Sequence, residues 1–213
     1  MASDRVPLIL IASTIATGIV DAVSFLAFGR VFTANMTGNV VLLGFAIGGA
    51  PDLSVSRCLL ALGAFAFGAI AGGRLSLDVK RSPVWMARAF AIEAILLGVA
   101  SAVVSASAMN SAIAVTALAM GLRNAAVRKL AVPDLTTTVL TLTITGAAAD
   151  SSLAGGTNPR WQRRLGSVVA MIAGAIAGAF LLRISIALPL AISAVTAAAC
   201  AIAFRNQPKE NPA

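Results

Sequence analysis

Four polar side chains recur at every second position in the stretch FTANMTGN, within a part of the chain that is otherwise apolar. They are Thr33, Asn35, Thr37 and Asn39. Their hydroxyl and amide groups both donate and accept hydrogen bonds. Irregular backbone inside a membrane needs such partners, because lipid offers none. The stretch therefore predicts a break in a membrane helix, whose polar groups either bind a solute or satisfy the freed backbone.

A second polar stretch, PDLTTTVLTLTITG, has the same character. Pro133 disfavours a continuous helix through Val132, and Asp134 is a suitable N-cap for a helix that starts after it. The first turn would then contain Thr136, Thr137 and Thr138. If both stretches begin short helices whose positive ends point toward the protein centre, together they favour an anion or a polar headgroup.

Two carboxylates lie inside apolar segments, Asp21 and Glu93. A carboxylate within the membrane is costly and marks a functional site by default. We predict that Asp21 binds substrate and carries a proton, and that Glu93 is a second candidate proton carrier. Structural alternatives stay open: Asp21 could pair with Arg30, and Glu93 with Arg88, five residues before it.

The composition of the whole chain is that of a membrane protein. Of its 213 residues, 59% are hydrophobic and 11% are charged, and the mean hydropathy is +0.93. Soluble domains carry about 25% charged residues, so this chain has too little charge to cover the outer faces of a soluble helical bundle. The net charge of +8 does not predict nucleic-acid binding. The basic residues lie between apolar segments, where they orient helices and meet anionic lipid.

The sequence offers no support for enzyme chemistry. It contains no histidine, and its two cysteines, Cys58 and Cys200, lie in separate apolar segments without metal-ligand spacing. The G-x-S-x-G and G-x-x-x-x-G-K-[ST] motifs are missing. We therefore predict no enzyme activity, no cofactor and no metal site.

Eight apolar segments follow one another along the chain. They fall near 7–29, 31–50, 57–75, 84–106, 109–130, 135–150, 164–182 and 184–204. The first is longer than the core of about 7–15 residues in a signal peptide, so it predicts a retained helix. We expect a single membrane domain over 1–206 and a short polar tail, 207–213, with a disordered composition.

The two halves of the chain resemble each other. An offset of 103 residues pairs Gly18 with Gly121 and Asp21 with Asn124. The sequence GAIAG occurs twice at an offset of 106, over 68–72 and 174–178. Several matches in the same order predict two repeats, about 7–106 and 109–204. The glycine pairs in GAIAG predict close packing between helices.

The basic residues decide between two topologies. If all eight segments span the membrane, the lysines and arginines divide nine against seven between its sides. If 31–50 and 135–150 enter and leave on the same side, thirteen lie with the termini and three, Arg30, Arg57 and Arg183, lie opposite. Cytoplasmic loops carry the basic excess. We therefore predict an all-α polytopic membrane protein with six transmembrane helices, two re-entrant or half-helix segments, two inverted repeats and cytoplasmic termini.

The stretch TGIVDAVSFLAFGRVFTANMTGNVVLLG resembles the YoaK-type family of small bacterial inner-membrane proteins, which is filed under a domain of unknown function. The signature reads G-x-x-D-A-x-S-F followed by F-T-A-N-M-T-G-N. The later stretch GLRNAAVRKLAVPDLTTTVLTLTITGAAAD is similar to the second signature of that family. The resemblance implies a polytopic protein of about six helices and no particular substrate. Arg123 stands where the resemblance would lead us to expect Gln.

Inverted repeats with interrupted helices are a common plan of secondary transporters. The predicted function is a small secondary transporter or exchanger of a small solute, anionic and coupled to a proton. A channel-like pore and an accessory or structural membrane protein without transport activity are the alternatives. The predicted substrate-binding residues converge on one cavity near the middle of the membrane: Asp21, Asn35, Thr37, Asn39, Asn124, Asp134, Thr136 and Thr137.

The expected surroundings follow from this interpretation. The chain should lie in the bacterial cytoplasmic (inner) membrane as a multi-pass protein, with the lipid bilayer and a small-molecule or ionic substrate as partners. A homodimer stays open, and no nucleic acid is expected.

Overall fold

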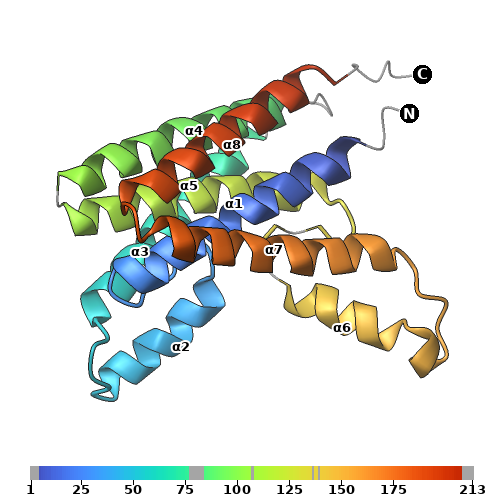
Figure 1. Cartoon of the computed structure of the whole chain (residues 1–213), viewed down its shortest axis with the longest axis horizontal. Helices are drawn as coiled ribbons and strands as arrows, with labels where there is room; N and C mark the ends of the chain where they lie inside the picture. The colour runs from blue at the N-terminus through green and yellow to red at the C-terminus, as the bar shows by residue number, and fades with distance from the viewer. Residues whose placement is uncertain (1–4, 77–83, 107, 136, 139, 208–213) are drawn as a thin grey trace.

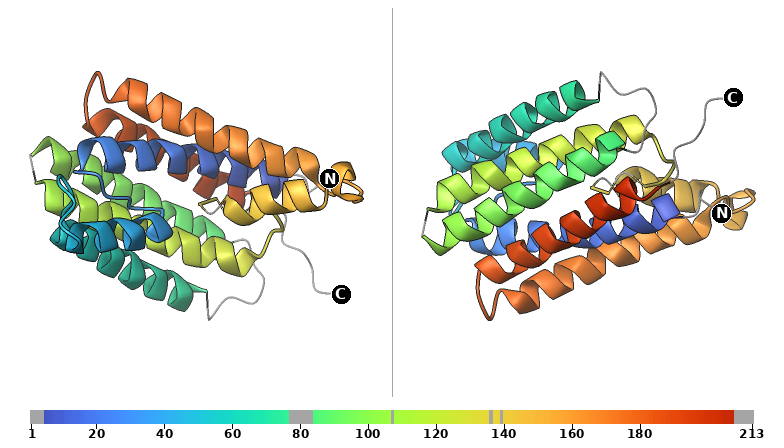
Figure 2. Two further views of the ribbon diagram at one scale, coloured as in Figure 1. Left: turned by 90° about the horizontal axis from the view of Figure 1, so that it is seen from below. Right: turned by 90° about the horizontal axis from the view of Figure 1, so that it is seen from above.

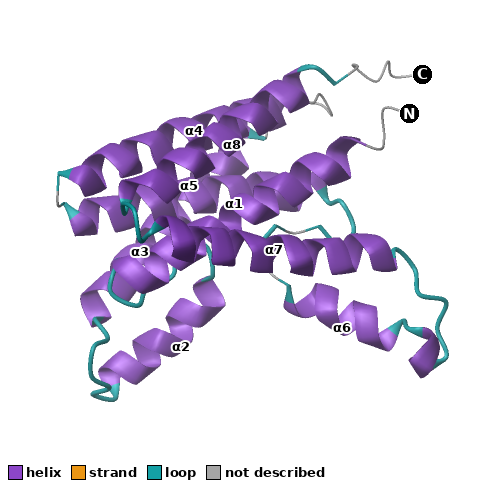
Figure 3. Ribbon diagram, viewed as in Figure 1, coloured by secondary structure: helices purple, strands orange, loops and turns teal. Residues whose placement is uncertain are grey.

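The computed structural model describes residues 5–76, 84–106, 108–135, 137–138 and 140–207, and the regular elements of these residues are helices (Figures 1 and 3). The helices are α1 (Arg5–Ala27), α2 (Met36–Ile47), α3 (Val55–Leu75), α4 (Val84–Ser105), α5 (Met109–Leu130), α6 (Thr141–Ala149), α7 (Trp161–Leu181) and α8 (Ala187–Arg205), and the 3₁₀ turn Ser152–Ala154 follows α6. From residue 208 on, the predicted disordered tail lies outside the described residues.

Five of these helices, α1, α3, α4, α7 and α8, are long and apolar enough to cross a membrane. They leave large apolar side chains such as Phe67, Ile95, Ile176 and Val195 exposed. Such a surface would be a liability in water, whereas in a bilayer it meets acyl chains. The expectation of an all-α polytopic membrane protein is therefore confirmed. The 22-residue α5 carries Arg123 and two further basic residues and is not among the five, so the count of six spans stays a prediction.

The two remaining helices are short and begin near the middle of the molecule, from which α2 and α6 run toward opposite ends (Figures 1 and 2). They have 12 and 9 residues, respectively. At 1.5 Å per residue neither approaches the hydrocarbon core of about 30 Å. The half-helix form predicted for 31–50 and 135–150 is what the structure has, although both helices are shorter than the apolar segments that contain them.

The start of α6 differs from the prediction. We expected Asp134 to cap a helix containing Thr136 to Thr138 in its first turn, and this is wrong, because α6 begins at Thr141 after Leu140. The preceding backbone is irregular: Ala131, Asp134 and Thr137 all have positive φ, between 53° and 65°. A β-branched residue such as Thr137 rarely adopts that conformation, so the helix cannot start before it.

The helices of the two halves make equivalent contacts. Helix α3 of the first half packs against α5 of the second, as α7 of the second packs against α1 of the first. Likewise α4 packs against α5 as α8 packs against α1, and α4 packs against α8. Exchanging α1 with α5, α3 with α7 and α4 with α8 therefore leaves the contacts unchanged. Each helix runs opposite to its equivalent, as Figures 1 and 2 show, so the repeats are inverted.

Equivalent glycines in the two repeats lie against the backbone of equivalent partner residues. A Cβ on Gly121 would overlap the carbonyl oxygen of Phe65, and a Cβ on Gly18 would overlap that of Met171. The partners Phe65 and Met171 are themselves 106 residues apart. Two GAIAG pairs behave in the same way, with Gly68 and Gly72 against Leu118 and Leu122, and Gly174 and Gly178 against Ile15 and Ile19. The small residues thus permit backbone contact between the repeats.

The N-terminal end of α1 and the C-terminal end of α8 lie at the same end of the molecule (Figures 1 and 2). The same end carries the C-terminal turn of α3, the C-terminal turn of α5 with Arg128 and Lys129, and the N-terminal turn of α7 with Arg163. The opposite end carries the α2–α3, α4–α5 and α7–α8 connections, which hold few basic residues. We call these the basic end and the sparse end.

Candidate functional site

The segment before α2 is held by the asparagines of the first polar stretch. The Asn39 side chain accepts a hydrogen bond from the Phe32 N–H (2.8 Å) and donates one to the Phe32 carbonyl oxygen. Asn35 caps α2 by accepting from the Gly38 N–H at 3.2 Å. Asn39 is buried, whereas Thr37 is exposed on α2. Both asparagines therefore fix the shape of this segment, and Thr37 lies apart from them.

Two polar atoms beside this segment have no hydrogen-bond partner among the described residues. One is the hydroxyl oxygen of Thr33, which is fully buried, and the other is Oδ1 of Asp21 on α1. The Asp21 carboxylate interacts with the backbone N–H of Ala34, so Asp21 faces the segment that contains Thr33. Asp21 does not pair with Arg30, which instead lies 3.8 Å from Asp52 at the surface.

The second repeat places Asn124 in the same relation to the segment before α6. The Thr138 hydroxyl donates a hydrogen bond to Oδ1 of Asn124, and the Asn124 amide donates to the Met120 carbonyl oxygen at 2.9 Å. Thr137 is buried, and its hydroxyl has no hydrogen-bond partner among the described residues. Thr136 lies outside the described residues. Asp21 and Asn124, which are 103 residues apart, thus each contact the segment preceding the half-helix of their own repeat.

Asp134 lies apart from these groups, in an ion cluster with Arg160, Arg164 and Asp150. Its carboxylate accepts from Arg160 Nε at 2.6 Å and from Arg164 Nε at 3.0 Å. Arg164 also contacts Asp150 at 2.8 Å and donates to the Gly146 carbonyl oxygen near the end of α6. This Asp134 cluster therefore links both ends of the α6 segment to the N-terminal turns of α7.

The ion cluster changes the acidity of Asp134. Partial burial acts to raise its pKa, but the hydrogen bonds and positive charges of Arg160 and Arg164 together outweigh burial, and the pKa lies below its ordinary value. Asp134 is therefore a carboxylate at neutral pH and already has two cationic partners. Its chemistry is that of a structural link rather than of a proton carrier.

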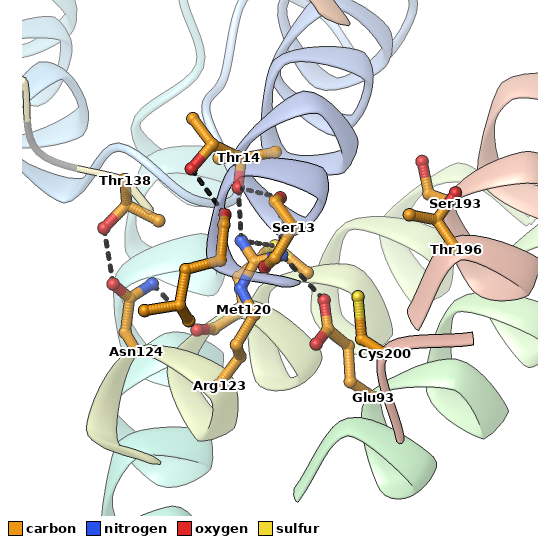
Figure 4. Close-up of polar contacts among 12 residues, drawn as sticks. Ser13, Thr14, Glu93, Met120, Arg123, Asn124, Thr138, Ser193, Thr196 and Cys200 are labelled. Carbon is orange, nitrogen blue, oxygen red and sulfur yellow. Dashed lines mark hydrogen bonds and ion pairs between the residues drawn. The ribbon is translucent and has the colours of Figure 1, made fainter. Parts of the chain in front are cut away.

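Glu93 pairs with Arg123 rather than with Arg88. The Arg123 guanidinium donates to Glu93 Oε1 at 2.8 Å and to Thr17 Oγ1 at 2.6 Å, and it lies 3.4 Å from the Ser13 carbonyl oxygen. The side chains of Glu93 and Arg123 are 0% and 1% exposed. Figure 4 shows this pair between α4 and α5, with Cys200 of α8 beside Glu93. Arg123 thus joins the second repeat to α1 and α4 of the first.

A cavity of about 980 Å³ lies beside α5. Asn124 and Thr138 line it, together with residues of α3, the C-terminal half of α5 and the start of α6. The apolar residues of the lining are Phe65, Ala69, Ala125, Val127, Ala131, Val132, Leu135 and Leu142. Arg128, Lys129 and Gly73 complete the wall toward the basic end. Asp21, Asn35, Thr37, Asn39 and Asp134 do not line this cavity.

The predicted site residues therefore form three groups. Asp21 lies beside the first segment, which Asn35 and Asn39 hold. Asn124 contacts the second segment through Thr138, and Asp134 lies in its ion cluster. Sequence reasoning missed the Arg123–Glu93 pair, although one signal for it was present: Glu93 and Arg123 are oppositely charged and both lie within long, otherwise apolar segments. Among the described residues no cluster of three or more His, Cys, Asp or Glu side chains could hold a metal ion.

Comparisons with known proteins agree with this architecture. A family model described as "Protein of unknown function (DUF1275)" matches residues 9–203. The "UPF0700 transmembrane protein YoaK" of Bacillus subtilis (strain 168) is 35% identical over 144 residues, which cover 65% of this chain and 64% of that protein. No solved structure matches the chain. The match with the family model includes all eight helices, in whole or in part. This multi-pass membrane protein therefore belongs to the DUF1275 family of proteins of unknown function.

Proposed function

We propose that the protein is a small secondary transporter or exchanger of an anionic solute in the bacterial inner membrane, with Asp21 as the group that couples a proton to transport. One observation carries the proposal. The segments preceding α2 and α6 each hold a buried threonine hydroxyl, of Thr33 and Thr137, without a hydrogen-bond partner among the described residues. A buried polar group left unpaired costs about 1–3 kcal/mol, so its retention favours a functional reason.

The half-helices support the anion specificity. Both α2 and α6 begin near the middle of the molecule (Figure 2), where their N-terminal N–H groups and positive dipole ends attract negative charge. Inverted repeats with such helices are the plan of many secondary transporters, in which one repeat moves against the other around a central site. The glycine contacts between the repeats are compatible with that movement, because they place few side chains between the helices.

Asp21 supports proton coupling by its position. It combines a buried carboxylate oxygen without a hydrogen-bond partner with a place beside the segment before α2. A carboxylate in this setting can bind a proton when its segment is open to one side of the membrane and release it when that segment is open to the other. Glu93 is the weaker candidate, because its Oε1 is held by Arg123.

The test begins with a thermal-shift screen of metabolites on the purified protein, since any ligand of the native state raises its stability. Uptake of a ligand found in this way is then measured in proteoliposomes across a pH gradient. Asp21→Asn should remove the dependence of uptake on the pH gradient. Asp52→Asn is the matched control, because it makes the same change at an exposed carboxylate, and it should leave uptake unaltered.

Three results would decide against parts of the proposal. If the Asp21→Asn variant takes up the ligand at the wild-type rate and with the wild-type pH dependence, Asp21 has a structural role and does not couple a proton to transport. Current that grows linearly without saturation favours the channel-like pore. A wild-type protein that neither binds nor moves any of the screened anions supports the accessory role instead.

A further inference from the structure

The cavity beside α5 has walls that suit a hydrocarbon chain. Eight of its lining residues are apolar, from Phe65 and Ala69 on α3 to Leu142 on α6. Its two neutral polar residues, Asn124 and Thr138, already bond to each other, and the Asn124 amide bonds to Met120. Few polar atoms are thus left in the wall for a small hydrophilic solute, which would lose its hydration without replacement.

The charge of the cavity is confined to one side. Arg128 and Lys129, in the last turn of α5, line the cavity where it meets the basic end, and both are exposed. Lys129 donates one hydrogen bond, to the Gly73 carbonyl oxygen at 3.2 Å, and Arg128 forms no ion pair with a described residue. Both side chains can therefore contact a negative group at the mouth while the apolar wall takes an attached chain.

We propose that this cavity binds an amphipathic anion, with its acidic head at Arg128 and Lys129 and its hydrocarbon chain against α3, α5 and α6. The volume of about 980 Å³ lies at the upper end of the range, about 300–1,000 Å³, of pockets that bind organic ligands. The inference builds on the proposed function, because it names the substrate class of the same transporter. The shared chemistry fits either a free long-chain acid or an acidic membrane lipid.

Photolabelling tests the assignment without requiring transport. The full-length protein is placed in nanodiscs of uncharged phosphatidylcholine with a palmitic acid probe that carries a diazirine in its chain, irradiated and mapped by mass spectrometry. We expect labels on the α3 peptide around Phe65–Gly73 and on the peptide from Ala125 to Leu142. Unlabelled palmitate should compete, whereas hexadecanol, which lacks the charge, and acetate, which lacks the chain, should not.

The glycines of α3 provide a matched pair of variants. A Cβ added at Gly73, in the cavity wall, would meet no atom within 4 Å, and the same holds for Gly63, which lies on the same helix outside the cavity. Gly73→Leu should abolish labelling, and Gly63→Leu should preserve it, with equal melting temperatures for both proteins. Arg128→Gln combined with Lys129→Gln should weaken palmitate competition roughly thirtyfold, as expected for the loss of two surface cations that attract an anion.

The outcomes separate the source of the ligand from the proposal itself. A diazirine-bearing phosphatidylglycerol that labels the same peptides identifies the acidic membrane lipid, and labelling by palmitate alone identifies the free acid. Equal labelling of Gly73→Leu and Gly63→Leu, or competition by hexadecanol as strong as by palmitate, overturns the inference. If a small polar anion is taken up in a way that depends on Asp21 and the cavity is not labelled, the proposal of an amphipathic substrate is overturned and the transport function stands. If the cavity is labelled but no uptake is found, only the transport function is contradicted.

Discussion

At the scale of single residues, the Arg123–Glu93 pair is the least exposed ion pair among the described residues. Both side chains are essentially without solvent, so their attraction is weakly screened, and Arg123 extends from the second repeat to Thr17 on α1. Two atoms of the pair, Arg123 Nε and Glu93 Oε2, have no hydrogen-bond partner among the described residues. The charges therefore depend on each other, and either one alone would be a buried, uncompensated ion.

This dependence predicts the outcome of a double-mutant cycle. Glu93→Gln should destabilise the protein by about 3–5 kcal/mol because it leaves the Arg123 cation unpaired, and Arg123→Gln should have a similar effect. The double variant should recover most of the loss. The measurement is thermal unfolding in detergent, with each variant compared at one detergent concentration.

Arg88→Gln is the control for this cycle. Arg88 lies on α4 five residues before Glu93 and is exposed, so its loss should change the melting temperature little. A large effect of Arg88→Gln together with a neutral Arg123→Gln would contradict the pairing and restore the alternative that the sequence alone left open.

How far the sequence predicts the site is clearest at this scale. The offset of 103 residues pairs Asp21 with Asn124, and in the structure each of them contacts the segment before the half-helix of its own repeat. The sequence predicts this correctly because the two repeats share their backbone fold as well as their residue types. Asp134 was assigned to the same cavity from its proximity to the threonines along the chain. Its actual partners, Arg160 and Arg164, are 26 and 30 residues away, and no local pattern indicates such a contact.

At the scale of elements, the two half-helices are held differently. The α6 segment is linked at both ends to α7 by the Asp134 cluster, in which Arg164 is 6% exposed. The connection after α2 has a looser ion pair, Arg30–Asp52, at 3.8 Å with both side chains more than half exposed. An exposed pair contributes little to stability, so α2 depends on the Asn35 and Asn39 hydrogen bonds instead.

The Asp134 cluster predicts a pH dependence confined to α6. The pKa of Asp134 is lower in the folded protein than in the unfolded chain, so its stabilising contribution is complete at neutral pH. It is lost only as the pH falls below the ordinary aspartate value of about 4 toward the lowered pKa. Amide hydrogen exchange of residues 141–149 should therefore accelerate below about pH 4 in the wild-type protein, beyond the change in intrinsic exchange rate.

Two variants make this measurement specific. Asp134→Asn should show accelerated exchange of α6 already at neutral pH and lose the additional acid-dependent step. Asp52→Asn, which removes the exposed partner of Arg30, should leave α6 unchanged. Equal exchange of α6 in the wild-type protein and in Asp134→Asn at neutral pH would mean that the cluster does not hold this helix.

At the scale of the whole molecule, the hydropathy of the sequence predicted where the long helices begin and end. The distribution of its basic residues predicted which helix ends lie on the same side. The segment 109–130 coincides with α5, and the other long helices begin and end within three residues of their apolar segments. The uneven distribution of basic residues predicted that the chain begins and ends on one side, and the start of α1 and the end of α8 do lie at one end of the structure (Figures 1 and 2). The start of α6 could not be predicted, since it depends on tertiary contacts of Asp134 and on the backbone at Thr137.

The basic end predicts the orientation in the cell, because cytoplasmic loops carry the excess of Lys and Arg. In a variant whose Cys58 and Cys200 are replaced by Ala, Asn206→Cys should react with a membrane-impermeant maleimide only after the inner membrane is opened. Asp52→Cys and Ser185→Cys, at the sparse end, should react in intact spheroplasts. The N-terminal position Ser3, a further test of the same side, lies outside the described residues.

Reaction of Asn206→Cys in intact spheroplasts would contradict the orientation. Reaction of Asp52→Cys and Asn206→Cys from the same side would contradict the topology itself, since these positions lie at opposite ends of the structure.

The contrast between the basic and sparse ends also bears on biosynthesis. If the basic end stays in the cytoplasm, each connection that must pass through the bilayer is short: five residues join α7 to α8, and seven join α2 to α3. Few charged groups would have to cross, chiefly Arg30, Asp52, Arg57 and Arg183. The insertion machinery could therefore deliver the helices as hairpins in order of synthesis. The second repeat would enter in the reverse sense because an odd number of full spans precedes it.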